Sequence, residues 1–162
     1  MYRPVKVWVC FAVMMVWLCA GGAYALELPD AVNEWHCVNE HVVPLILDAN
    51  GENLGRMVYR DYVRDFPKGS LQIIMTEGRG TGSLYVPEGV RDSRGAMSAE
   101  SGYEILNVAD RKSVLEKREY LPLALAVDVG DNVILTIESG SLTESGIVSF
   151  AEEVLSSWRS TE

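Results

Sequence analysis

The side chains best suited to chemistry lie close together in the first third of the chain: His36, Cys37 and His41, with Glu34 and Glu40 beside them. Zinc and copper accept imidazole and thiolate donors, but a closed zinc site usually takes four ligands, and both histidines of the chain are already counted. On a β-strand, residues 36 and 37 would point to opposite faces and could not share one ion. We therefore expect no metal and no cofactor, and keep a metal site at these three residues as the alternative.

The thiol of Cys37 could also react or join two chains. As a nucleophile it would need a base that lowers its pKa, and either histidine could serve, but no third group that orients the base can be identified. As an unpaired thiol in an exported protein, it could form a disulfide with a second copy. A plain, half-buried thiol is the simpler interpretation. No catalytic residue is assigned from the sequence.

Residues 1–25 have the pattern of a cleavable secretory signal peptide. Arg3 and Lys6 precede an apolar run over residues 7–19, and small residues lead to Ala25. The apolar run is shorter than the roughly 20 residues that span a bilayer, so an uncut anchor is the less favoured alternative. A lipoprotein leader acylated at Cys19 is disfavoured because Leu18 stands where a small residue is needed. We expect cleavage after Ala25 and export to the periplasm or the exterior.

The rest of the chain, residues 26–162, is expected to form one exported domain with a core of its own. The leader holds two of the fourteen basic residues and no acidic one, so its removal changes the net charge from −9 to −11. Nucleic acid and anionic lipid would repel such a domain, and we expect neither nucleic-acid binding nor stable membrane insertion after the leader is removed. Cys37 would be the last remaining cysteine, which excludes an internal disulfide.

The first half of this domain reads as strands and turns. Residues 42–47 predict a strand that stops at a turn over residues 48–51. Residues 54–66 are ambiguous, because Leu54, Val58, Tyr62 and Phe66 recur every fourth residue as in a helix, yet the composition favours extended chain. We predict a hairpin with residues 71–76, and arginines paired with aspartates on a solvated face: Arg56, Arg60 and Arg64 with Asp61 and Asp65. Residues 87–102 predict a long loop and a contact surface.

The second half predicts four strands and a helix. The strands are expected at residues 103–108, 112–120, 123–129 and 133–137, with the polar second one at an edge of the sheet. Ser141 and Glu144 fit a capping box at the start of the helix. One apolar stripe follows it: Ile147, Phe150, Ala151, Val154, Leu155 and Trp158. The fold class is therefore α+β, an antiparallel sheet of about six to eight strands packed by one amphipathic C-terminal helix.

The order of these last elements suggests a family. The segments Thr136-Ile-Glu-Ser and Ser141-Leu-Thr-Glu and the helix over residues 147–155 resemble the ending of small exported α+β domains of the Mog1 and PsbP-like kind. They are also similar to extracytoplasmic domains of anti-sigma-factor-associated envelope proteins. The resemblance implies a binding or accessory module and not an enzyme. It carries no functional residue over to this chain.

The function expected from the sequence is thus a non-catalytic binding or accessory protein of the cell envelope. Its partner would be another envelope protein or a small amphiphile, and the protein would be a monomer or a Cys37-linked dimer. The alternative is a thiol- or metal-dependent envelope protein that uses His36, Cys37 and His41. A hydrolase whose site is not visible in the sequence is a third hypothesis.

Overall fold

The computed structural model describes residues 27–79, 102–117 and 122–159. The expected leader and nearly all of the expected loop over residues 87–102 lie outside these ranges. In the described part of the chain, no helix is both long and apolar enough to cross a membrane.

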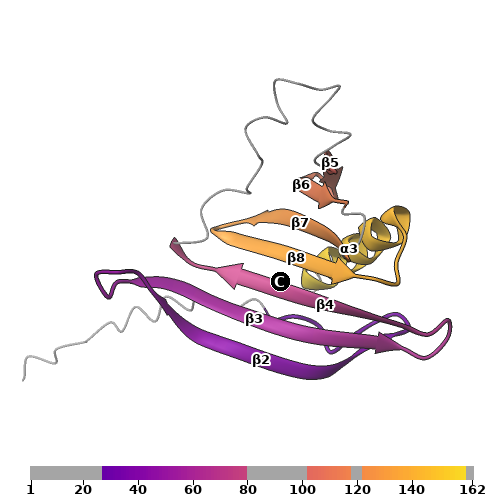
Figure 1. Ribbon diagram of the computed structural model, residues 1–162, viewed down its shortest axis with the longest axis horizontal. Helices are drawn as coiled ribbons and strands as arrows, with labels where there is room; N and C mark the ends of the chain where they lie inside the picture. The colour runs from indigo at the N-terminus through magenta and orange to yellow at the C-terminus, as the bar shows by residue number, and fades with distance from the viewer. Residues whose placement is uncertain (1–26, 80–101, 118–121, 160–162) are drawn as a thin grey trace, which may run out of the picture.

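The described residues form one antiparallel sheet of eight strands with a C-terminal helix, so the predicted α+β fold class is confirmed (Figure 1). The strand order is β1-β2-β3-β4-β8-β7-β6-β5, so two consecutive meanders meet at the β4–β8 pair in the middle. The strands are β1 (Ala31–Val32), β2 (Trp35–Leu47), β3 (Asn53–Arg64), β4 (Gly69–Glu77), β5 (Tyr103–Val108), β6 (Arg111–Glu116), β7 (Leu123–Gly130) and β8 (Val133–Ser139).

Helix α3 (Glu144–Arg159) packs on one face of this sheet. Its predicted apolar stripe is buried, except that Trp158 is only partly so. Alternate residues of the strands complete the core, as period-two patterning requires: Ile73, Leu125, Leu135 and Ile137 are fully buried. Phe150 contacts Trp35 and Tyr62 edge-on, with ring centroids 5.8 and 6.2 Å apart, and so joins the helix to β2 and β3.

Two local expectations were wrong. The strand predicted for an edge, β6, pairs with β5 and β7, and β5 is the outer strand, because strand order depends on contacts that polarity does not encode. The residue that caps α3 is Thr143, whose hydroxyl accepts the amide hydrogen of Gly146. The hydroxyl of Ser141, the predicted cap, bonds instead to the backbone of Ser70 on β4 and so makes a tertiary contact.

Candidate binding surface

Strand β2 carries all three sequence-predicted site residues but does not bring them together. Antiparallel partners share a face of the sheet. Cys37 is paired with the buried Tyr62 and faces the side that α3 covers, whereas His36 and His41 are paired with Val63 and Tyr59 on the other side. Among the described residues, no group of three or more histidine, cysteine or acidic side chains is placed to hold a metal ion.

The thiol of Cys37 is half-buried and hydrogen-bonded. Its Sγ donates to the carbonyl oxygen of Asn39 at 3.3 Å, and its backbone amide donates to the carbonyl oxygen of Asp30 at 2.8 Å. The ring of His41 lies beside that of Tyr59, with centroids 6.1 Å apart. Neither histidine is placed to act as a base for the thiol, because both face the opposite side of the sheet.

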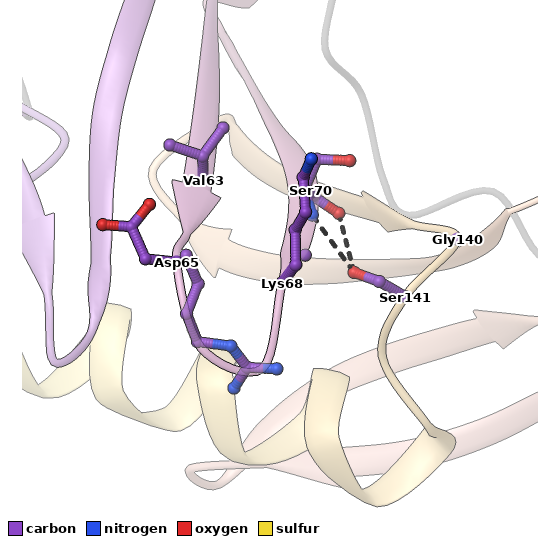
Figure 2. A pocket seen from close by; sticks show the side chains of 8 residues that line it. Val63, Asp65, Lys68, Ser70, Gly140 and Ser141 are labelled. Atoms are coloured by element: carbon purple, nitrogen blue, oxygen red, sulfur yellow. Dashed lines mark hydrogen bonds between the residues drawn. The ribbon is translucent and has the colours of Figure 1, made fainter.

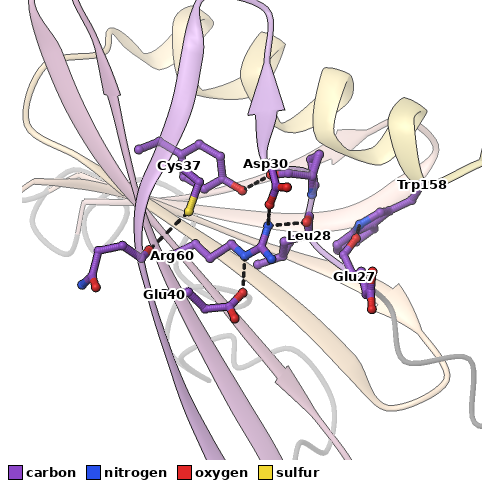
Figure 3. Close-up of polar contacts among 10 residues, drawn as sticks. Glu27, Leu28, Asp30, Cys37, Glu40, Arg60 and Trp158 are labelled. Atoms are coloured by element: carbon purple, nitrogen blue, oxygen red, sulfur yellow. Dashed lines mark hydrogen bonds and ion pairs between the residues drawn. The ribbon is translucent and has the colours of Figure 1, made fainter.

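Arg60 forms the densest polar cluster beside this strand (Figure 3). Its guanidinium pairs with the carboxylates of Glu40 and Asp30 and also donates to the carbonyl oxygen of Leu28. Only 13% of the side chain is exposed. The arginine row therefore does not form the solvated, aspartate-paired face expected from the sequence: Arg56 pairs with Glu77, and Arg64 lies over the ring of Trp35.

The N-terminal segment 27–30 is held against the domain by its own backbone (Figure 3). Four consecutive carbonyl oxygens accept hydrogen bonds: Glu27 from Trp158 Nε1, Leu28 from Arg60, Pro29 from the hydroxyl of Tyr62, and Asp30 from the amide of Cys37. Leu28 and Val32 are buried in the core. This segment and β1, residues 27–32, are called the strap; it could not be predicted from the sequence, because the donors come from distant elements.

An open hollow of about 860 Å³ lies where the β3–β4 turn meets the loop before α3 (Figure 2). It is lined by Val63, Arg64, Asp65, Lys68, Gly69, Ser70, Gly140 and Ser141. The polar groups of Ser70 and Ser141 bond to each other, and Arg64 donates to the carbonyl oxygen of Pro67. These groups hold the turn and the loop together, and they do not converge on the space.

The outer edge of β2 is the most apolar exposed feature of the described residues. Four of their six exposed large apolar side chains lie on this strand: Val38 at 55%, Val42 at 39%, Leu45 at 49% and Leu47 at 53% exposure. β1 pairs only with Trp35 and His36, so within the described part of the chain the edge beyond them has no partner strand (Figure 1). The sequence predicted a strand here. It could not predict that the strand lies at an edge, because a β-branched run suits a buried strand equally well.

The β2 edge, defined here as residues 38–47, carries only part of the protection usual for an edge strand. Natural edges are commonly shielded by lysine or other charges, by proline or by bulges. Glu40 is the only aspartate, glutamate, lysine or arginine between Val38 and Leu47, and it pairs with Arg60. Protection is limited to Pro44 and to register shifts on either side of the run Asn39–Val43. The β2 edge is therefore able to accept another strand.

No family model matches this chain, and neither the curated proteins nor the solved structures contain a match.

Proposed function

We propose that this chain is an exported, non-catalytic binding protein of the cell envelope and that the β2 edge is its binding surface. Addition of a strand satisfies unpaired backbone groups and covers side chains on both faces of the sheet. The single observation that carries the proposal is the row of exposed aliphatic side chains on an edge without a partner strand in the described residues.

Two further observations support binding over catalysis. In the hollow beside the β3–β4 turn, Ser70 and Ser141 bond to each other, and the three candidate side chains of β2 lie on opposite faces. The signal-like leader supports export. The segment that follows it is part of the folded domain from Glu27 onward, so cleavage after Ala25 would leave that domain complete.

Photo-crosslinking in intact cells tests the proposal. A photoreactive amino acid replaces Val42 on the β2 edge or, as the control, the exposed Glu152 on α3. We expect a discrete adduct from position 42 and none from position 152, with a mass that identifies the partner. Absence of an adduct at 42, or equal adducts at both positions, would contradict a binding role for this edge.

Mass spectrometry of the natural product tests the proposed cleavage of the leader and the export of the protein. A protein that begins at Leu26 and is recovered outside the cytosol is expected. A product that retains Met1 inside the cell would contradict export while leaving the crosslinking result interpretable.

A further inference from the structure

The middle of the β2 edge can pair with the same segment of a second copy of the chain. Regular pairing with β3 runs from Asn39 to Val43, between the two register shifts. Two identical strands related by a twofold axis pair antiparallel, and each residue then lies opposite one equally far from the axis. An axis at His41 brings the two regular runs into complete overlap, because His41 is the middle residue of the run.

The charges of the strand permit this pairing. With the axis at His41, Glu40 of one copy lies opposite Val42 of the other; with the axis at Val42, it lies opposite Pro44. Among residues 38–47, two carboxylates would oppose each other only if the axis passed through Glu40, and like charges directly opposite destabilise a strand pair. Each Glu40 also keeps its ion pair with Arg60 of its own chain.

The same register covers exposed apolar surface. With the axis at His41, Val38 of one copy comes opposite Pro44 of the other. Burying aliphatic surface stabilises association by roughly 25 cal/mol per Å² removed from water, before the cost of immobilising the two copies. The exposed Val38 and Val42 are thus covered in the same step that pairs the backbone.

We infer that the occupant of the β2 edge is a second copy of this chain, paired antiparallel about a twofold axis near His41. The inference rests on the proposed function, since it names the partner of the same edge. Because both copies use the same strand, the assembly stops at two copies. The two eight-stranded sheets then form one continuous sheet with both α3 helices on one face.

This dimer is distinct from one linked through Cys37. Cys37 lies just outside the paired run, because its backbone amide is already bonded to the carbonyl oxygen of Asp30, so the two thiols stand at opposite ends of the pair, beyond the reach of a disulfide. The dimer therefore persists in reductant and in Cys37→Ser. Because each copy carries a net charge of −9, or −11 without the leader, raising the salt concentration screens their repulsion and strengthens the association.

Sedimentation equilibrium of the purified protein over a range of concentrations tests the inference. We expect a monomer–dimer equilibrium that Val42→Glu weakens by at least about tenfold, because the added carboxylate would lie opposite Glu40 of the other copy. Ile105→Glu, the same kind of change at an exposed site on the opposite edge strand β5, should have no effect. Matching thermal melts establish that both variants fold.

Disulfide trapping supplies a readout that does not depend on a destabilising charge. In a Cys37→Ser background, His41→Cys should form a covalent dimer under an added oxidant, because residue 41 faces its own copy across the axis, and Ile105→Cys should not. Dimers trapped through residue 105, or chains longer than two copies, would overturn the inference. If the protein stays monomeric while position 42 crosslinks to a different protein in cells, the inference fails and the proposed function stands. A monomer with no crosslink contradicts both.

Discussion

Single side chains decide how the polar parts of this domain are buried. Tyr62 lies on β3 under α3 with no exposed surface, and its hydroxyl donates to the carbonyl oxygen of Pro29 at 2.5 Å. Burial raises the pKa of Tyr62 to about 12, against the opposing influence of the Arg60 guanidinium. The fold therefore favours the neutral phenol, and the strap depends on it remaining protonated.

The pH dependence of stability should reveal this group. An unfolded tyrosine ionises near pH 10, so the contribution of Tyr62 is complete below that pH and is lost as the pH rises toward 12. The expected loss in the free energy of unfolding is about 2–3 kcal/mol, measured by urea denaturation at successive pH values. Tyr62→Phe should flatten this alkaline loss and cost about 1–3 kcal/mol at neutral pH, because the Pro29 carbonyl loses its donor. Tyr59→Phe, on the other face, is the control; an unchanged alkaline profile in Tyr62→Phe would contradict the assignment.

Ala109 occupies a conformation that suits glycine better. It lies in the β5–β6 turn with a φ of 49°, next to Asp110 at 63°, which is the left-handed pair that two-residue hairpins use. Ala109→Gly should raise the free energy of unfolding by about 0.5–1 kcal/mol in chemical denaturation, because the turn no longer holds a side chain in this region. Ala126→Gly, the same substitution inside β7, should lower it by a similar amount. Equal effects at the two sites would rule out backbone strain as the cause.

At the scale of elements, the sequence predicted the type of most segments and missed what depends on their neighbours. The repeat of four residues in β3 shows why. A spacing of four is close to one turn of a helix and is also two full periods of a strand, so periodicity alone could not decide. In the strand, Arg56, Arg60 and Arg64 share a face with Val58 and Tyr62, and this explains why the arginines pair within the protein and do not form a separate solvated face.

The β3–β4 pair depends on two glycines whose role is also non-local. A Cβ added to Gly55 would lie 1.9 Å from the carbonyl oxygen of Glu77, and one added to Gly78 would lie 2.4 Å from the Cα of Gly55. Both residues have positive φ angles, 141° and 125°. Each glycine is thus required because the other strand passes too close for any side chain.

Gly55→Ala should therefore be strongly destabilising. We expect a loss of more than about 3 kcal/mol in the free energy of unfolding, from the clash together with the strained φ. Gly51→Ala, in the β2–β3 turn, also has a positive φ of 80° but meets nothing within 4 Å, and should cost only about 1 kcal/mol. The free energies of unfolding of the two variants, measured by chemical denaturation, separate the effect of the steric clash at residue 55 from the effect of backbone strain alone at residue 51. Similar losses at both sites would mean that the close contact with Glu77 is not what requires glycine.

At the scale of the whole molecule, the strap connects parts that are far apart in the sequence. It contacts β2 and β3 from the first meander and Trp158 near the end of α3. Nothing in the local sequence indicates that Leu28 and Val32 are buried. The strap also explains how the domain can begin so close behind the expected leader.

Shortening this segment tests whether the strap is part of the folded domain. Leu28→Ala should cost about 2–5 kcal/mol, because it opens a cavity in the core, whereas Glu27→Ala should be almost neutral because the atom that Trp158 binds is the backbone carbonyl oxygen. A chain that begins at Ala31 loses all four carbonyl contacts and the Leu28 side chain, and should melt at a lower temperature than one that begins at Leu26. Both chains keep the β2 edge, so their dimerisation can be compared at temperatures where each is folded. Equal melting temperatures would show that residues 26–30 are dispensable, and the domain would then begin at β1.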